Sequence, residues 1–210
     1  MNMAMCVLIG YLIGNINPAF IIGKLRGFDI RQRGSGNAGA SNVVITMGKK
    51  AGLFTALFDI FKAAAAAYIA CFFFPHIKFA KILSASACLL GHVFPFMMRF
   101  HGGKGLACLG GMIIAFDPRV FLLMLGFEIA LGLTADYVCI VPTTGSLIFT
   151  AVYALMTGDP IGTLILAVVS MVIMYKHIEN FRRIQQGTEA HISFLWRKDQ
   201  EIERIRNNAN

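Results

Sequence analysis

The stretch GSGNAGASN, residues 34–42, is glycine-rich and polar, and it interrupts a chain that is otherwise strongly apolar. Two similar segments follow: GHVFP at 91–95, running on to HGGKG at 101–105, and HIEN at 177–180, running on to GTE at 187–189. Open backbone beside lipid must be satisfied by protein or trapped water. Three such segments in 210 residues therefore indicate one polar site at a membrane face.

The composition around these segments is that of an integral membrane protein. The chain is 57% hydrophobic and 14% charged, and its mean hydropathy is +0.67. These values exclude an ordinary soluble domain. Apolar runs recur along the whole length, which predicts a single membrane domain at 1–192 followed by a charged cytoplasmic tail at 193–210. The first run is long enough to span a membrane and lacks the basic start of a signal peptide.

The fold class expected is an all-α membrane protein with about seven transmembrane helices. The apolar segments lie at 3–23, 53–74, 80–98, 105–117, 119–135, 138–157 and 160–176. The segment at 105–117 is short for a span, which needs about 20 residues. The boundary between 119–135 and 138–157 is weak. Five spans with re-entrant pieces therefore stay open as an alternative.

The formal charge of +8 is placed as membrane topology requires, rather than as a nucleic-acid surface. With the N-terminus outside, 15 of the 19 lysines and arginines fall on the inner side. This bias predicts an N-out, C-in protein with all three polar segments facing the cytoplasm. The tail at 193–210 is interpreted either as an amphipathic surface helix or as a solvated, frayed end.

The first two polar segments suggest anion binding. Residues 34–39 match GxGxxG, but a dinucleotide fold needs a preceding strand, and none is expected here. The alternatives for this segment are a backbone amide nest with side-chain donors, or a plain interhelical turn. Three glycines around Lys104 favour a phosphate loop over a merely basic loop. It is not a Walker A loop, because Leu106 stands where Ser or Thr would hold Mg²⁺.

The third segment lies at the inner end of the last apolar run, where Lys176 precedes His177. His177 and Asn180 are three residues apart and share a helix face. Arg182 and Arg183 are interpreted as topology anchors.

Three ionisable groups lie within apolar runs, and two of them are interpreted as structural. Asp59 and Lys62, at spacing i, i+3, are predicted to pair. Glu128 stands alone in its run, and a structural partner and an interface are both open.

Other chemistries have no support in the sequence. There is no H-x4-D acyltransferase motif and no GxSxG elbow. No His, Cys or carboxylate spacing suggests a metal, and no cofactor is expected. The cysteines lack any CxxC and are predicted to be reduced core residues: Cys6, Cys71, Cys88, Cys108 and Cys139.

Over nearly its whole length the chain resembles the bacterial acyl-phosphate:glycerol-3-phosphate acyltransferases of the PlsY type. The resemblance rests on long motifs in matching order. They are Asn15 with Asn17-Pro18-Ala19; residues 34–43; Asp59 with Lys62; residues 91–95 through 102–105; and His177, Glu179, Asn180, Arg183, Gly187, Thr188 and Glu189.

The resemblance implies acyl transfer from a fatty acyl phosphate to the 1-hydroxyl of glycerol 3-phosphate, the first step of phospholipid synthesis. It implies no cofactor or metal, a bacterial inner-membrane location, membrane lipid as surroundings, and other phospholipid-synthesis enzymes as partners. The implied catalytic residues are Ser35, Lys104, His177 and Asn180. The implied substrate-binding residues are Gly36, Asn37, Gly39, Asn42, His92, Gly102, Gly103, Gly105 and Glu189.

The chain departs from the family pattern at Ile45 and Ile178, where Arg is usual, at His101, where Lys is usual, and at Cys139 and Pro142, where Ser is usual. These departures keep a second reading open: a divergent paralogue with another acceptor, or a non-catalytic partner of lipid-synthesis enzymes. A small transporter is a third class, and it predicts an internal repeat that the sequence does not show.

Overall fold

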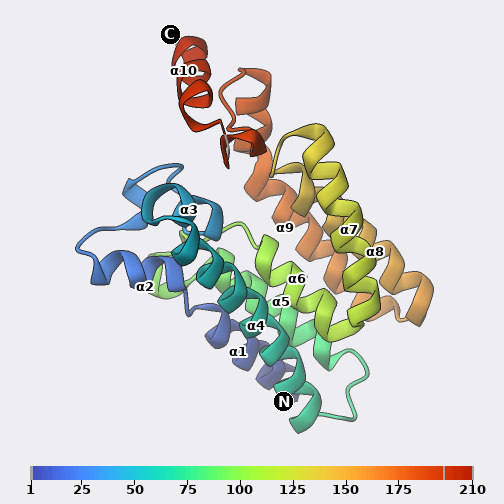
Figure 1. Ribbon diagram of the computed structural model, residues 1–210. Coiled ribbons are helices and arrows are strands. Elements are labelled where there is room, and N and C mark those ends of the chain that lie inside the picture. The colour runs from blue at the N-terminus through green and yellow to red at the C-terminus, as the bar shows by residue number, and fades with distance from the viewer. Residues whose placement is uncertain (1, 196, 210) are drawn as a thin grey trace.

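The computed structural model describes residues 2–195 and 197–209, and over these residues the protein is entirely helical (Figure 1). The α-helices are α1 Asn2–Gly14, α2 Pro18–Leu25, α3 Ala40–Met47, α4 Lys49–Phe73, α5 Ala80–Val93, α6 Leu106–Phe116, α7 Pro118–Ala135, α8 Ile140–Thr157, α9 Pro160–Gln185 and α10 Lys198–Ala209. Short 3-10 turns lie at Ile30–Gln32, Phe96–Met98 and Ile192–Leu195.

The expectation of an all-α membrane protein is confirmed. Six helical stretches of the described chain are long and apolar enough to cross a membrane, with α1 and α2 together forming the first. The remaining predicted segment, at 105–117, corresponds to α6, whose 11 residues are too few for a perpendicular span. The last predicted span continues nine residues beyond its predicted end at 176, because α9 runs unbroken to Gln185.

Small residues bring the helices of the core together. The side of α4 that carries Ala63, Ala66, Ala67 and Ala70 is buried. Where α1 meets α5, a Cβ on Gly10 would lie 2.1 Å from the carbonyl oxygen of Ser84. Close backbone approach through small residues is how helices associate in lipid, where the hydrophobic effect gives no preference for protein over tails. The opposite side of α4 exposes large apolar residues: Phe54, Leu57, Phe61 and Phe72.

The first span is broken between α1 and α2, and other parts of the chain satisfy the break. Asn15 accepts a hydrogen bond from the amide of Phe96 at 2.7 Å. Asn17 caps α2 by accepting from the amide of Phe20, and it donates to the carbonyl of Ala38 at 3.0 Å. The free carbonyl of Ile16 accepts from Nζ of Lys62 at 2.7 Å. The two asparagines therefore tie the break to the first and second polar segments.

The predicted pair of Asp59 and Lys62 is confirmed. Nζ of Lys62 lies 2.6 Å from Oδ1 of Asp59, and both side chains are buried. Nδ1 of His92 lies 3.1 Å from the same Nζ, so the pair is a three-member cluster between α4 and α5. Glu128 has a structural partner, because it accepts a hydrogen bond from Thr144 at 3.0 Å. The five cysteines are free, as predicted.

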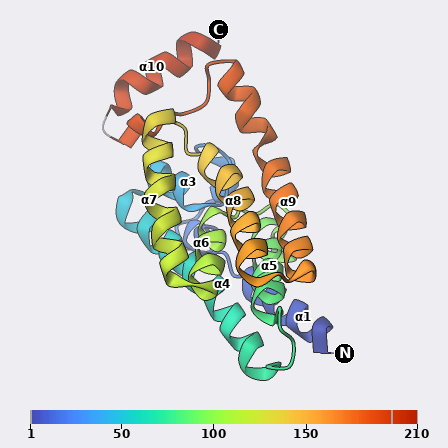
Figure 2. The same ribbon diagram turned by 90° about the vertical axis from the view of Figure 1, so that its right-hand side faces the viewer.

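The polar segments gather at the end of the molecule opposite the N-terminus. Figures 1 and 2 show α3 and α10 at this end, and the N-terminus at the other. The tail is not a frayed end, since α10 folds back on residues 187–191 and Glu201 is buried. The helical part of the surface-helix interpretation is therefore confirmed.

Candidate functional site

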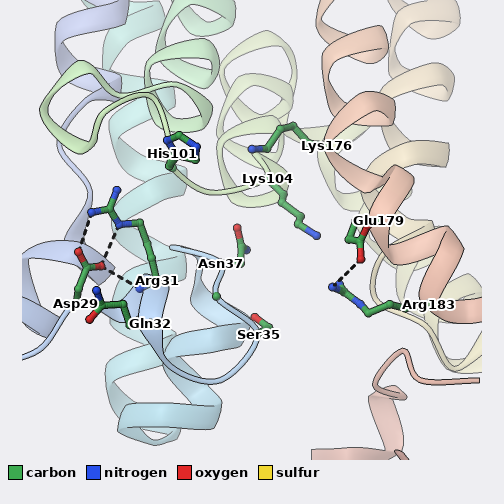
Figure 3. Close-up of a pocket in the computed structure, with 12 residues that line it drawn as sticks. Asp29, Arg31, Gln32, Ser35, Asn37, His101, Lys104, Lys176, Glu179 and Arg183 are labelled. Carbon is green, nitrogen blue, oxygen red and sulfur yellow. Dashed lines mark hydrogen bonds and ion pairs between the residues drawn. The ribbon is translucent and has the colours of Figure 1, made fainter. Parts of the chain in front are cut away.

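A pocket of about 510 Å³ opens at this polar end, and all three polar segments contribute to it (Figure 3). Ser35 and Asn37 lie on one side, and Lys104, Glu179 and Arg183 on the other. The lining residues are Asp29, Arg31, Gln32, Ser35, Gly36, Asn37, His101, Gly102, Lys104, Lys176, Glu179 and Arg183. The sequence therefore placed these distant segments correctly in one site.

The loop before α3 is shaped by Asn42, which is fully buried. Its Oδ1 accepts from the amide of Ser35 at 2.9 Å, and its Nδ2 donates to the carbonyl of Asn37 at 2.9 Å. Asn42 thus bonds chiefly within its own loop and shapes it, while its expected role as a direct substrate ligand stays a prediction. Gly39 is the N-cap of α3 and lies outside the pocket lining. Ser35, Gly36 and Asn37 do line the pocket.

Four amides of the first two polar segments are bonded within the protein. The amides of Gly102 and Gly103 donate to the carbonyls of Val93 and His92, both at 3.1 Å. The amide of Gly36 donates to the carbonyl of Arg33, and that of Ser35 to Asn42. These four donors are therefore not available to an anion in this arrangement.

Glycine at 103 is required by the close approach of a histidine rather than by a ligand. A Cβ at Gly103 would lie 2.1 Å from Nε2 of His92. His92 is buried and lies behind the loop, outside the pocket lining, and its expected substrate contact stays a prediction. Gly105, at φ +89°, makes the left-handed turn from which α6 begins. His92 and Gly105 therefore act on the loop that carries Lys104.

On the third segment, Asn180 links two other site residues. Lys104 donates from Nζ to Oδ1 of Asn180, and Nδ2 of Asn180 donates to Oε1 of Glu189 at 2.5 Å. The other oxygen of Glu189 accepts from Nε of Arg183 at 2.7 Å. Asn180 and Glu189 lie just behind the lining and hold Lys104 and Arg183 in place.

His177 and Asn180 are both buried on the inner face of α9, as their spacing predicted. Nδ1 of His177 lies 2.8 Å from the carbonyl of Ile173. A carbonyl only accepts, so Nδ1 carries the proton, and a neutral ring leaves Nε2 as an acceptor.

The cations of the pocket differ in whether a carboxylate neutralises them. Arg31 is paired with Asp29 at 2.7 Å, and Arg183 with Glu189. Across the described residues, Lys104 and Lys176 have no carboxylate oxygen within ion-pairing distance. Burial, together with the nearby charge of Arg183, lowers the pKa of the Lys104 ammonium to about 8. The hydrogen bond from Arg31 lowers the pKa of the Asp29 carboxyl to about 2.

The lining residues missed or misread from the sequence include Asp29, Arg31, Gln32 and Arg183. Arg31 and Asp29 precede the glycine-rich stretch, and the signal for them was the Asp-x-Arg spacing. Arg183 was read as a topology anchor, yet it lies three residues after Asn180 on the same helix face. Arg182 fits the anchor interpretation, because its side chain is 69% exposed.

The departures from the family pattern fall in different surroundings. His101 lines the pocket. Ile45 is partly exposed on α3, outside the pocket lining. Cys139 and Pro142 are buried at the start of α8. Ile178 is exposed on α9.

One group of metal-ligand types lies outside the pocket. Asp59, His92 and Cys108 offer atoms within 4.8 Å of one another. Lys62 places its ammonium beside two of them, 2.6 Å from Asp59 and 3.1 Å from His92. The ammonium of Lys62 therefore supplies the positive charge beside Asp59 that a metal ion would otherwise supply.

Fold and site together define a multi-pass membrane protein with a pocket rich in basic residues at one end of its helices. Residues 4–187 match the family model for glycerol-3-phosphate acyltransferase. The chain is 35% identical over 197 residues to the glycerol-3-phosphate acyltransferase of Bacillus subtilis (strain 168), covering 93% of this chain and all of that one. It is 36% identical to glycerol-3-phosphate acyltransferase 1 of Oceanobacillus iheyensis, over 91% of this chain and 95% of the relative.

Solved structures give the same result. A crystal structure of PlsY (YgiH), an integral membrane glycerol 3-phosphate acyltransferase in its glycerol 3-phosphate form, superposes with a TM-score of 0.83 at 31% identity, covering 93% of this chain and 98% of that chain. The lysophosphatidic acid form superposes with a TM-score of 0.81, covering 93% and 97%. The chain belongs to the PlsY family of glycerol-3-phosphate acyltransferases, which act in phospholipid biosynthesis.

Proposed function

We propose that the protein transfers a fatty acyl group from acyl phosphate to the 1-hydroxyl of glycerol 3-phosphate. The products are 1-acyl-glycerol 3-phosphate, a lysophosphatidic acid, and inorganic phosphate. The observation that carries the proposal is the pair of lysines, Lys104 and Lys176, which face one pocket without a carboxylate to neutralise either among the described residues. Both substrates carry phosphate, and two such ammonium groups suit a dianion.

The reaction needs no acyl-enzyme, because the donor is already activated. The hydroxyl oxygen attacks the acyl carbonyl carbon, and the bond from that carbon to the phosphate oxygen breaks. The phosphate leaves with the bonding electron pair, and one of its oxygens takes the hydroxyl proton. The ammonium of Lys104 offsets the charge that grows on the departing phosphate.

The remaining residues orient the reactants. Ser35 and Asn37 face the lysines across the pocket and position the substrates by hydrogen bonds. Asn180 aims Lys104, and Glu189 holds Asn180. His177 presents Nε2 as the acceptor of its neutral ring and orients the acceptor hydroxyl or relays its proton.

The proposed setting is the bacterial inner membrane, with the pocket facing the cytoplasm. The excess of basic residues in the loops at this end supports that orientation. A donor with a lipid tail and a phosphate head reaches such a pocket from the membrane, while a water-soluble acceptor reaches it from the cytoplasm. The proposed chemistry uses no metal or cofactor.

A second candidate is acyl transfer to another acceptor. It is favoured by Ile45 and Pro142, which stand where the family pattern has a cation and a hydroxyl. Each lost hydrogen bond to a charged group costs about 1.5–3 kcal/mol. An acceptor without a phosphate would not need these groups.

Purified protein, given acyl phosphate and glycerol 3-phosphate, tests the proposal by phosphate release and lysophosphatidate formation. Equal amounts of both products support it. Phosphate release without lysophosphatidate shows that the donor chemistry survives and that glycerol 3-phosphate is not the acceptor, which refutes the proposal. Neither product from the wild type, with both from Ile45→Arg, refutes an active enzyme and identifies a relic whose scaffold is intact.

A further inference from the structure

The C-terminal helix α10 lies beyond the stretch that matches the family model, which ends at residue 187. It does not extend away from the molecule. Arg204 donates from Nη1 to the carbonyl of Gly187 at 2.5 Å and from Nη2 to the carbonyl of Glu189 at 2.6 Å. Asn208 adds a second hydrogen bond to the carbonyl of Gly187 at 2.9 Å. Side chains of α10 therefore hydrogen-bond to the backbone of the third polar segment.

A carboxylate on the same helix, that of Glu201, holds the guanidinium of Arg204 in place. Glu201 accepts from Nε and Nη2 of Arg204 at 3.0 and 2.6 Å, a two-point contact that holds the guanidinium plane. The side chain of Glu201 is only 6% exposed, so this pair is better shielded than an ordinary surface ion pair. Glu201 also accepts from the amide of His191 at 2.8 Å. The hydrogen bond from Arg204 lowers the pKa of the Glu201 carboxyl, which stays charged at neutral pH.

Glu189 is thus held at both of its ends. Its carbonyl binds Arg204, and its carboxylate binds Asn180 and Arg183. Asn180 in turn accepts from Lys104. A continuous series of hydrogen bonds therefore runs from α10 to the ammonium that faces the pocket.

We infer that Arg204 is a positioning residue for the acyl transfer: through Glu189 and Asn180, it sets where Lys104 meets the phosphate of the substrate. The inference rests on the proposed function for its kinetic consequences. It also predicts a change in the pKa of Lys104, which can be measured without catalytic activity.

The kinetic test compares Arg204→Ala, Arg204→Lys and Arg197→Ala in the full-length chain. Arg197 is an exposed arginine of the same tail and serves as the matched control. We expect Arg204→Ala to lower kcat by about tenfold, the scale of one lost positioning hydrogen bond. Arg204→Lys retains the charge and one donor direction, so it recovers part of the rate, whereas Arg197→Ala keeps the wild-type rate.

The second test measures the pKa of Lys104 directly, from the pH dependence of its labelling by an amine-reactive reagent, read by mass spectrometry. The carboxylate of Glu189 raises that pKa, so its displacement in Arg204→Ala lowers the pH at which Lys104 begins to react. The same labelling profile in wild type and Arg204→Ala refutes the inference, even if the wild type proves inactive. A shifted profile in an inactive wild type keeps the inference about Lys104 and refutes the proposed function.

Discussion

Lys104 and Asn180 are 76 residues apart in the sequence, and the ammonium of the first donates to the side-chain oxygen of the second. Asn180 is a neutral partner, so it fixes the direction of the ammonium without cancelling its charge. The charge is therefore available to a phosphate, in contrast to the arginines of the pocket, whose partners are carboxylates.

Replacing Lys104 with alanine should lower kcat/KM by roughly 10- to 150-fold, since a hydrogen bond to a charged group contributes about 1.5–3 kcal/mol. Initial rates of phosphate release over a range of acyl phosphate concentrations measure this. Lys78→Ala, at an exposed lysine of the opposite end, is the control. A wild-type rate in Lys104→Ala would show that Lys104 has no role in the reaction.

Activity should fall as the pH rises through about 8. Lys104 is charged below its pKa of about 8 and neutral above it, so the ammonium that binds phosphate is lost on the alkaline side. The pH profile of kcat/KM reports this pKa for the free enzyme. Arg183→Gln removes a nearby positive charge and should move the alkaline limb to higher pH. If the pH at which activity falls is the same in Arg183→Gln and in the wild type, Lys104 is not the group whose titration causes the fall.

Gly103→Ala should lower activity by at least several-fold, because the added methyl group meets the ring of His92 at 2.1 Å. Overpacking of this kind costs about 1–3 kcal/mol and displaces the loop that carries Lys104. Gly126→Ala on α7 is the matched control, since a Cβ there meets nothing within 4 Å. Equal activity of the two variants would show that the loop tolerates displacement.

Lys62→Met should destabilise the protein by about 3–5 kcal/mol, because it leaves Asp59 buried without its main partner. Thermal unfolding in detergent, followed by circular dichroism, measures the effect. The double variant Asp59→Leu with Lys62→Met should recover much of the loss, since no uncompensated charge remains. If the double variant is no more stable than Lys62→Met, the carboxylate is not the source of the damage.

Local spacing accounts for what the sequence predicted well. Asp59 and Lys62 were paired correctly because residues three apart on a helix are neighbours. The joint pocket followed from placing three polar segments at one membrane face. The uses of individual groups were not predictable in the same way. Asn42 bonds to residues of the loop before α3, the amides of Gly102 and Gly103 bond to the end of α5, and His92 contacts Lys62 on α4. No sequence interval encodes those contacts.

Helix length explains a further difference. The apolar pattern of the last span ends near residue 176, whereas α9 continues to Gln185 on polar residues. That extension turns Arg183 toward the pocket and leaves Arg182 exposed. Hydropathy identifies only the part of a helix that lies within the membrane, and it does not show how far the helix continues outside the membrane.

The break between α1 and α2 leaves the ribosome long before its partners do. Lys62 is 46 residues behind the carbonyl of Ile16, and Phe96 is 81 residues behind Asn15. Until those residues have been synthesised, the carbonyl of Ile16 and the side chain of Asn15 lack these donors, and water at the membrane surface must satisfy them. The order of synthesis thus means that the pocket forms late, only after α4 and α5 have entered the bilayer.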